Sequence, residues 1–313
     1  MAITGSLVPN ITIFEPGGRI DLAKTRWHMR WMFERGADGL FLTGSYGAGP
    51  LMSLQERVSI FQLAKEVAAG FERRTLIAHV GCIDAAEAVE LAQAAERAGV
   101  DAVGAVPPFY YKHTDDAVVE YYRAILGAVK IPVFAYNNPE TTRYTLNLKT
   151  LRRLQELGLA GLKDSPLSLG FITQVAYAAQ EAGSDFQFIP GTSTGWLPLC
   201  YMGVKAVIAG TSNWAPEIIT ELLRATSADE RERARKVYLV SMDLSNKMHF
   251  TDSTIASHMA LYARGYDAGY PRRPMLLPPF SDPKYAEIRG WLEKGFAELG
   301  LRLDAGDFSP QAG

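Results

Sequence analysis

The stretch from Leu159 to Leu167, LAGLKDSPL, decides how the whole chain is interpreted. An apolar run ends in a single lysine, Lys163, and is followed by residues that form turns. This pattern is typical of a short buried parallel strand that delivers one amine at its C-terminal end. Burial without a partner carboxylate lowers the pKa of a lysine, so we expect a nucleophilic amine suited to Schiff-base chemistry. The alternative is that Lys163 extends past the strand end into water.

Short apolar runs alternate with helical patterns along most of the chain, which predicts parallel βα repeats. Eight units recur at intervals of roughly thirty residues, and eight is the number that closes a (β/α)8, or TIM, barrel of about 250 residues. The expected strands are Leu7–Ile13, Gly39–Leu42, Thr75–Val80, Ala102–Val106, Pro132–Tyr136, Ala160–Lys163, Phe186–Ile189 and Ala206–Ala209. The expected helices between them include Leu22–Arg35, Leu54–Ala69, Ala85–Ala98, Ala117–Val129, Leu148–Leu157 and Leu169–Ala182.

The pattern after Ala215 is purely helical. We therefore expect an α/β protein in two parts, a (β/α)8 barrel over residues 1–227 and a C-terminal helical region over residues 228–313, packed on the barrel or on a neighbouring subunit. The helices expected in this last part of the chain are Pro216–Thr226, Asp229–Met248, Thr251–Tyr262 and Pro283–Leu299.

Composition indicates an ordinary globular protein with small-molecule partners. The 313 residues are 48% hydrophobic and 21% charged, and the net charge of −2 predicts neither nucleic acid nor an anionic membrane as a partner. The two cysteines, Cys82 and Cys200, lie far apart without a CxxC pattern, which favours a reducing compartment. The first residues lack the pattern of a secretory signal, so we expect a cytoplasmic protein.

The active site of a closed βα barrel lies at the C-terminal ends of its strands. Those ends carry glycines, small hydroxyl residues, tyrosines and one lysine. The stretches concerned are Thr43–Gly49, Pro107–Tyr111, Tyr136–Pro139, Lys163, Gly191–Ser193 and Gly210–Asn213.

Two of these strand ends suggest roles beside Lys163. The loop Gly44–Gly49 has neither the P-loop order nor G-x-G-x-x-G, but its backbone N–H groups could hold a carboxylate; the alternative is a tight turn. Tyr136 ends the strand next to that of Lys163, and a tyrosine there can carry the protons that carbinolamine formation and dehydration require. The alternative is an ordinary half-buried aromatic side chain.

Metal and serine-hydrolase chemistry are not expected. The five histidines show no HxH or HExxH spacing, and no G-x-S-x-G occurs. His79 ends the third strand and could face the site, but a hydrogen-bonded core histidine is the preferred interpretation. We expect no metal and no organic cofactor.

Three motifs carry a resemblance to a known family. They stand here as Gly44-Ser45-Tyr46-Gly47 for GTTGE or GSTGE, Tyr136-Asn137-Asn138-Pro139 for YNxP, and Gly161-Leu162-Lys163-Asp164-Ser165 for the GxK strand. Over roughly positions 5 to 300 the chain resembles the dihydrodipicolinate synthase / N-acetylneuraminate lyase family of Schiff-base-forming aldolases. The order of the motifs at the matching strand ends makes the resemblance specific.

The resemblance implies a (β/α)8 barrel with C-terminal helices and assigns roles to single residues. Lys163 would form an imine with the keto carbon of pyruvate or a related 2-oxo acid, and Tyr136 would be the acid and base. Ser45 and the backbone of Tyr46 would bind the α-carboxylate, while Ile208 would contact the pyruvoyl group through its backbone.

The resemblance also implies an assembly. Ser45 would link Tyr136 in a hydroxyl relay to Tyr110, which in synthase-like members reaches in from an adjacent subunit. Family members are usually tetramers built as dimers of dimers, so we expect a homotetramer.

The chain departs from the family pattern where the second substrate is recognised. Thr141 stands where synthases carry an arginine for the carboxylate of the aldehyde partner, and Arg143 lies two residues further on. Ala48 replaces the glutamate of GTTGE, the bulky Tyr46 replaces its second threonine, and Thr192-Ser193 replaces an acidic pair. None of these changes removes the imine chemistry.

The leading hypothesis is a lyase that cleaves or forms a carbon–carbon or carbon–oxygen bond of a 2-oxo acid through an imine at Lys163. One alternative is a true 4-hydroxy-tetrahydrodipicolinate synthase that condenses pyruvate with aspartate semialdehyde. Another is a non-catalytic barrel that binds 2-oxo acids, although such a protein needs neither Lys163 nor Tyr136. Phosphate-sugar binding at Gly191–Ser193 and Gly210–Ser212 is a further option.

Overall fold

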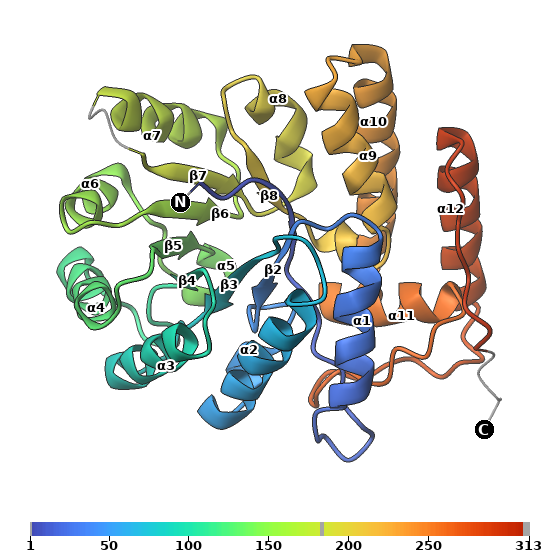
Figure 1. Ribbon diagram of the computed structural model, residues 1–313, viewed down its shortest axis with the longest axis horizontal. Coiled ribbons are helices and arrows are strands. Elements are labelled where there is room, and N and C mark those ends of the chain that lie inside the picture. Colours follow the sequence, from blue (N-terminus) through green and yellow to red (C-terminus); the bar gives the residue numbers. More distant parts are fainter. Residues whose placement is uncertain (1, 182–184, 309–313) are drawn as a thin grey trace.

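The computed structural model, which describes residues 2–181 and 185–308, confirms the TIM barrel (Figure 1). Eight parallel strands are hydrogen-bonded in the order β7-β6-β5-β4-β3-β2-β1-β8, and β7 and β8 contact each other at the two ends of that order. The barrel is therefore nearly closed. The strands are β1 (Gly5–Val8), β2 (Gly39–Leu42), β3 (Thr75–His79), β4 (Ala102–Ala105), β5 (Val133–Asn137), β6 (Gly161–Asp164), β7 (Gln187–Pro190) and β8 (Ala206–Ile208).

Helices alternate with the strands and surround them, as Figure 1 shows. The α-helices are α1 (Leu22–Glu34), α2 (Leu54–Ala68), α3 (Ala85–Arg97), α4 (Asp115–Ala128), α5 (Pro139–Thr142), α6 (Leu148–Glu156), α7 (Leu169–Glu181), α8 (Trp196–Cys200), α9 (Pro216–Ser227), α10 (Arg231–Lys247), α11 (Ser253–Ala263) and α12 (Lys284–Leu299). Short 3-10 helices are η1 (Gly49–Leu51), η2 (Ser193–Gly195), η3 (Gly210–Asn213) and η4 (Met248–Phe250). The predicted end of the seventh helix, Ala182, lies outside the described residues.

The first strand is shorter than predicted, because it ends at Val8 and not at Ile13. Beyond Val8 the chain turns, and the N–H of Asn10 donates to the Val8 carbonyl. The N–H of Ile11 then donates to the side chain of Asn213 instead of to a neighbouring strand. Apolar residues thus continue past the strand as a buried loop.

The register of the strands determines which side chains of the candidate site face the inside of the barrel. Tyr136 pairs with Lys163, and Lys163 pairs with Ile189. Residues paired in this way point to the same face of a sheet, and Tyr136 and Ile189 belong to the apolar core inside the barrel. Lys163 therefore points into the barrel, whereas its neighbour Asp164 and the paired Asn137 point outward toward the helices.

The inside of the barrel is packed with side chains, and two glycines make room for aromatic rings. A Cβ atom on Gly104 would lie 3.0 Å from Cε2 of Phe41, and one on Gly161 would lie 2.4 Å from Cε1 of Phe134. Gly161, two residues before Lys163, must therefore lack a side chain for its strand to pack inside the barrel. Buried apolar residues of this inner core include Leu7, Phe41, Ile77, Phe134, Ile189 and Ile208.

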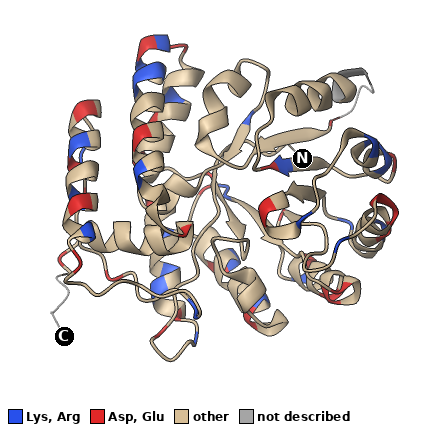
Figure 2. Cartoon of the chain, turned by 180° about the vertical axis from the view of Figure 1, so that it is seen from behind, with Lys and Arg blue, Asp and Glu red and all other residues tan. Residues whose placement is uncertain are grey.

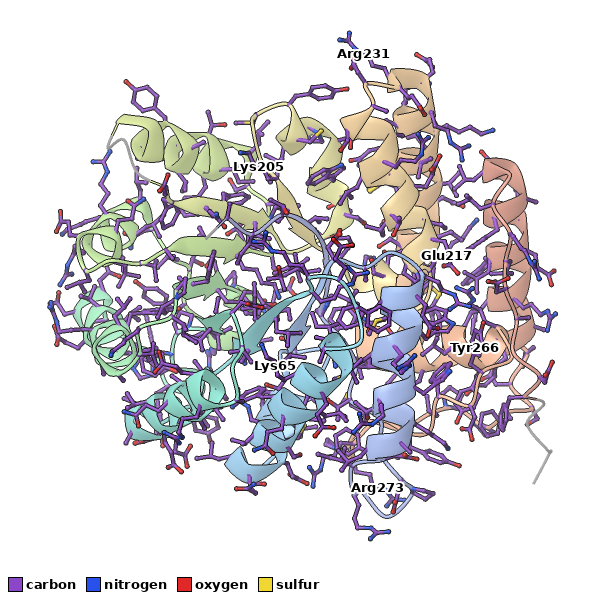
Figure 3. The ribbon with its side chains drawn as sticks, viewed as in Figure 1. Lys65, Lys205, Glu217, Arg231, Tyr266 and Arg273 are labelled. Carbon is purple, nitrogen blue, oxygen red and sulfur yellow. The ribbon has the colours of Figure 1, made fainter. Side chains whose placement is uncertain are left out.

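The C-terminal helices pack on the barrel through α9 and η3, and a buried arginine links them to it. Arg264 follows α11 and donates to both carboxylate oxygens of Glu217, at 3.2 and 2.8 Å, and to the carbonyls of Trp214 and Asp304. Glu217 also pairs with Arg35 at 3.2 Å, and it lies where α1 meets α9 (Figure 3). One carboxylate therefore holds together the barrel and the tail.

Charged residues lie mostly on the outer helices and loops, and the central strands contain few of them (Figure 2). Within the described part of the chain, no helix combines the length and the apolar character needed to cross a bilayer.

Candidate active site

The amine of Lys163 lies between two aromatic rings at the C-terminal end of the barrel. The side chain is only 4% exposed, and Nζ lies 3.8 Å from the ring centres of both Phe41 and Tyr136. Burial lowers the pKa of Lys163 below its ordinary value, while the neighbouring Tyr136 acts in the opposite direction. The side chain is thus buried, as one of the two sequence interpretations expected, and does not extend into water.

The hydroxyl of Tyr136 is the centre of a hydrogen-bond network. Ser165 Oγ and Asn138 Nδ2 donate to it at 3.4 and 3.3 Å, and the hydroxyl of Ser45 also bonds to it. Burial alone would raise the pKa of Tyr136, but the charge of Lys163 and these hydrogen bonds outweigh burial, so the pKa lies below its ordinary value. A phenol with a lowered pKa beside an amine is suited to carry protons to and from that amine.

The ring of His79 packs against that of Tyr136. The two rings meet edge-on at 6.0 Å, Nδ1 of His79 lies 3.2 Å from a guanidinium nitrogen of Arg57, and its Nε2 lies 3.3 Å from the N–H of Val106. Burial and then the charges of Arg57 and Lys163 hold the pKa of His79 well below its ordinary value, so the ring is neutral. The prediction of a hydrogen-bonded core histidine is confirmed.

Arg57 was not identified from the sequence. Its guanidinium is buried and donates to the carbonyl of His79 at 2.6 Å and to that of Gly81 at 3.2 Å. The available signal was its position on α2, three and four residues before the buried Ile60 and Phe61, which places an arginine on the apolar face of a helix.

Asn137 and Asp164, the residues that follow Tyr136 and Lys163, fix the loops that carry the site. Asn137 Nδ2 donates to Asp164 at 2.6 Å, and Asn137 Oδ1 accepts from the N–H of Leu146 at 3.0 Å. The second carboxylate oxygen of Asp164 accepts from the N–H of Leu167 at 2.9 Å. Asn137 and Asp164 therefore have structural roles. Burial raises the pKa of Asp164.

The glycine-rich loop after β2 is a tight turn. A Cβ atom on Gly49 would lie 1.9 Å from the carbonyl oxygen of Thr43, so only glycine fits there. The N–H groups of Ala48 and Gly49 donate to carbonyls of the same loop. Ser45 remains exposed at the tip of the loop and reaches Tyr136.

Other residues predicted for the site lie in different surroundings. Ile208 is buried inside the barrel on β8. Tyr110 is 72% exposed, has a positive φ of 79°, and packs its ring against Tyr111 at 5.0 Å. Thr141 donates to the carbonyl of Asn138 at 3.2 Å, and Arg143 ends α5 as an exposed residue. One chain therefore assembles Lys163, Tyr136 and Ser45, with Tyr110 outside this group.

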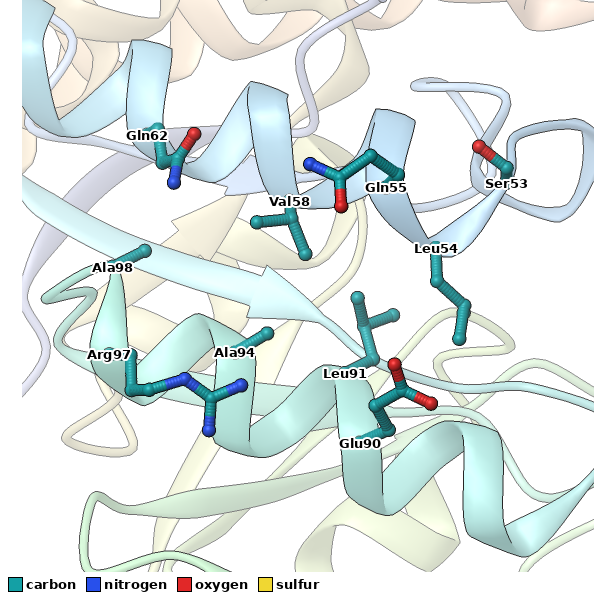
Figure 4. Close-up of a pocket in the computed structure, with 10 residues that line it drawn as sticks. All are labelled: Ser53, Leu54, Gln55, Val58, Gln62, Glu90, Leu91, Ala94, Arg97 and Ala98. Atoms are coloured by element: carbon teal, nitrogen blue, oxygen red, sulfur yellow. The ribbon is translucent and has the colours of Figure 1, made fainter.

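Two cavities lie elsewhere. One of about 520 Å³ lies between α2 and α3 on the outside of the barrel (Figure 4). A second of about 660 Å³ lies at the N-terminal ends of the strands, opposite the amine, and is lined by residues such as Ile3, Phe134 and Lys205. Among residues 2–181 and 185–308, no group of three His, Cys, Asp or Glu side chains is placed to hold a metal ion.

Comparisons with known proteins show the family to which the chain belongs. The profile of the Dihydrodipicolinate synthetase family matches residues 2–294. The 4-hydroxy-tetrahydrodipicolinate synthase of Bradyrhizobium diazoefficiens is 31% identical over 286 residues, 91% of this chain and 94% of that protein. The 2-dehydro-3-deoxy-D-gluconate/2-dehydro-3-deoxy-phosphogluconate aldolase of Thermoproteus tenax is 29% identical over 300 residues, 95% of this chain and 92% of that protein.

A solved structure of an aldolase has the same fold. The crystal structure of KD(P)GA from T. tenax superimposes with a TM-score of 0.83 at 27% identity, and the match covers 95% of this chain and 100% of that one. The chain belongs to the dihydrodipicolinate synthetase family and is an enzyme, a lyase of the class I aldolase type.

Proposed function

We propose that the protein is a lyase that acts on pyruvate or another 2-oxo acid through a Schiff base at Lys163. The observation that carries this proposal is the position of Nζ, which is buried, lies against Tyr136 and has no carboxylate partner among residues 2–181 and 185–308. A lowered pKa increases the unprotonated fraction of the amine, and only the unprotonated form attacks a ketone.

The proposed reaction uses Tyr136 as its proton carrier. Nζ of Lys163 attacks the keto carbon to give a carbinolamine, and loss of water gives the imine. Removal of a proton from the adjacent carbon gives an enamine, which adds to an aldehyde carbon, and the new alkoxide takes up a proton. Addition of water to the resulting imine releases the product and the free amine of Lys163; cleavage follows the same steps in reverse. The hydroxyls of Ser45 and Ser165 keep the Tyr136 oxygen oriented through these transfers.

Substrate binding in this proposal involves the rim of the barrel. Ser45 and the backbone of Tyr46 hold the α-carboxylate, and the backbone of Ile208 contacts the rest of the 2-oxo acid. Tyr110 is supplied by a second copy of the chain within a homotetramer. Its exposure and its positive φ, which costs a non-glycine residue about 1 to 3 kcal/mol, support a role in contact with another chain.

Borohydride reduction in the presence of pyruvate, followed by peptide mass mapping, tests the proposal. We expect a mass increase on the peptide that contains Lys163, and its loss in Lys163→Met, which keeps the volume of the buried side chain. Lys205→Ala is the matched control, since Lys205 is an exposed lysine distant from the site. Labelling of another lysine, or of none, would refute the proposal.

The alternative within the same chemistry is a true 4-hydroxy-tetrahydrodipicolinate synthase. Relatives with that name support it, while Thr141 argues against it, because a threonine cannot pair with the carboxylate of aspartate semialdehyde as an arginine does. Turnover of pyruvate with aspartate semialdehyde at a rate typical of enzymes would favour this alternative. Its absence, with the pyruvate adduct still formed, would exclude it.

A further inference from the structure

Arg57 of α2 is a buried cation that fastens the end of β3. It is 2% exposed, and its guanidinium donates to the carbonyls of His79 and Gly81 at 2.6 and 3.2 Å and to Sγ of Cys82 at 3.3 Å. Within the part of the chain that the structure describes, no carboxylate hydrogen-bonds to it. Burial of a charge without a partner carboxylate costs several kcal/mol, so these three acceptors from one short segment offset the cost.

The ring of His79 is fixed between Arg57 and the reacting groups. Nδ1 lies 3.2 Å from a guanidinium nitrogen of Arg57, and Nε2 accepts from the N–H of Val106 at 3.3 Å. An imidazolium ring needs an acceptor at each nitrogen, so these two flanking N–H groups keep the ring neutral. The ring centre lies 5.9 Å from that of Phe41 and 6.0 Å from that of Tyr136, the two rings that flank the reacting amine.

The carbonyl of His79 also supports the loop that carries Ser45. Oγ1 of Thr43 donates to this carbonyl at 3.2 Å, so the carbonyl accepts from Thr43 and from Arg57 at once. Thr43 is fully buried and has a φ of 50°, a left-handed conformation that costs a non-glycine residue about 1 to 3 kcal/mol and persists only with support from its surroundings. Ser45 follows two residues later and bonds to Tyr136.

We propose that Arg57 is a positioning residue for proton transfer at Tyr136 and that it acts through His79. The guanidinium holds the His79 ring edge-on against the phenol, and the shared carbonyl holds the start of the Ser45 loop. The inference rests on the proposed aldolase function, since Tyr136 is the proton carrier of that reaction. Loss of Arg57 therefore slows proton transfer, while pyruvate still reaches the amine of Lys163.

Exchange of the methyl protons of pyruvate in D2O tests the inference without a second substrate. Tyr136 takes a methyl proton from the imine to give the enamine and returns a deuteron from solvent, which restores the imine; NMR measures the rate. Arg57→Met should lower kcat of exchange about tenfold to a hundredfold, because a displacement of about 1 Å at a reacting group costs roughly 10²-fold. KM for pyruvate should stay near its native value.

The rate is divided by the fraction of chains that borohydride and pyruvate label at Lys163, so that loss of folded protein does not count. Arg264→Met is the matched control. Arg264 is also a buried arginine, but it joins the tail to the barrel through Glu217, so its loss should lower the melting temperature and leave the rate per adduct unchanged. If Arg57→Met gives no folded chain, Arg57→Lys decides by the same criteria, since a lysine lacks the fork that reaches two carbonyls.

Trapping at Lys163 separates the two ideas. Absence of the adduct in the native enzyme would refute the proposed function. An adduct in the native enzyme and in Arg57→Met, with the same exchange rate per adduct or with a change in KM alone, would overturn the inference and leave the proposed function intact. An equal loss in Arg264→Met, or no exchange in the native enzyme despite the adduct, would also overturn it.

Two variants at position 79 test the route through the ring. His79→Phe keeps an aromatic edge against Tyr136 and the carbonyl that Arg57 and Thr43 share, so it should retain most of the native kcat of exchange. His79→Ala keeps the carbonyl but leaves a space beside the phenol ring, and it should lower kcat about as much as Arg57→Met does. Equal rates in the two variants would overturn the inference.

Discussion

Nζ of Lys163 lies 3.8 Å from the centre of the Phe41 ring, so one side of the amine is covered by a surface that cannot donate or accept a conventional hydrogen bond. Phe41 also packs edge-on against Tyr136 at 5.7 Å. A ring that faces the amine and orients the phenol takes part in setting the pKa of both groups.

Phe41→Leu should move the pH midpoint of imine formation with pyruvate upward. Loss of the ring admits water, and burial, the largest cause of the lowered pKa of Lys163, shifts lysines by up to about 3 to 5 units. The lost attraction between cation and ring acts in the opposite direction but is worth only about 0.5 to 2 kcal/mol, or roughly one unit. The rate of borohydride-trapped adduct formation against pH measures the shift. Phe134→Leu, also inside the barrel, is the control and should leave the midpoint in place.

Tyr136→Phe should lower kcat by about 10² to 10⁴, the usual contribution of a positioned acid and base. The melting temperature should change little, since phenylalanine keeps the ring contacts with Phe41 and His79. Steady-state kinetics and thermal unfolding check both parts. A kcat close to the native value would exclude Tyr136 as the proton carrier.

Asn137→Ala should destabilise the fold more than the small size of the removed side chain suggests. It leaves the carboxylate of buried Asp164 and the N–H of Leu146 without the Asn137 side chain as their partner, at a cost of about 2 to 3 kcal/mol in the free energy of unfolding. Urea unfolding measures the loss. Asn147→Ala removes an exposed helix cap and is the comparison, with an expected cost of about 1 kcal/mol. Equal losses would contradict the structural role of Asn137.

The free energy of unfolding should decrease as the pH is lowered, because two histidines are buried in the fold. Burial lowers the pKa of His28 to about 4 and that of His258 to about 3, from 6.5, against the opposing effect of their backbone hydrogen bonds. The unfolded chain therefore binds more protons, and the stability present above pH 6.5 is lost as pH falls, through about 4 for His28 and about 3 for His258. Each contributes about 3 kcal/mol between pH 7 and pH 4.

Urea unfolding of His258→Gln at pH 7 and at pH 4.5 checks this prediction. The variant should lose less stability than the native protein over that interval. The same loss in both proteins would show that His258 does not titrate on unfolding.

The barrel could be predicted because its signals are local. Each strand is a short apolar run, most helices show an apolar periodicity over about a dozen residues, and Ser53 and Glu56 form a reciprocal cap at the start of α2. The first strand was predicted to be too long, since a buried loop and a buried strand have the same apolar composition. Helix α8 was missed, because five residues carry too little periodicity to be recognised.

The candidate site was predictable only in part. Lys163 and Tyr136 stand at strand ends, where a polar group after an apolar run is conspicuous. Phe41 and Arg57 were missed, since a phenylalanine in a strand resembles any core residue and the contact of Arg57 with His79 depends on how α2 packs. In the proposed homotetramer the surroundings of Tyr110 depend on a second copy of the chain, and the residues of its own loop do not reveal that contact.

The close contact between Tyr46 and Gly210, where a Cβ atom at position 210 would lie 2.1 Å from the Tyr46 hydroxyl oxygen, also constrains how the sequence can change over time. A substitution at position 210 meets the phenol ring, whereas a smaller residue at position 46 removes that obstacle. A smaller residue at position 46 therefore makes a side chain at position 210 less costly, so the two positions are coupled sterically.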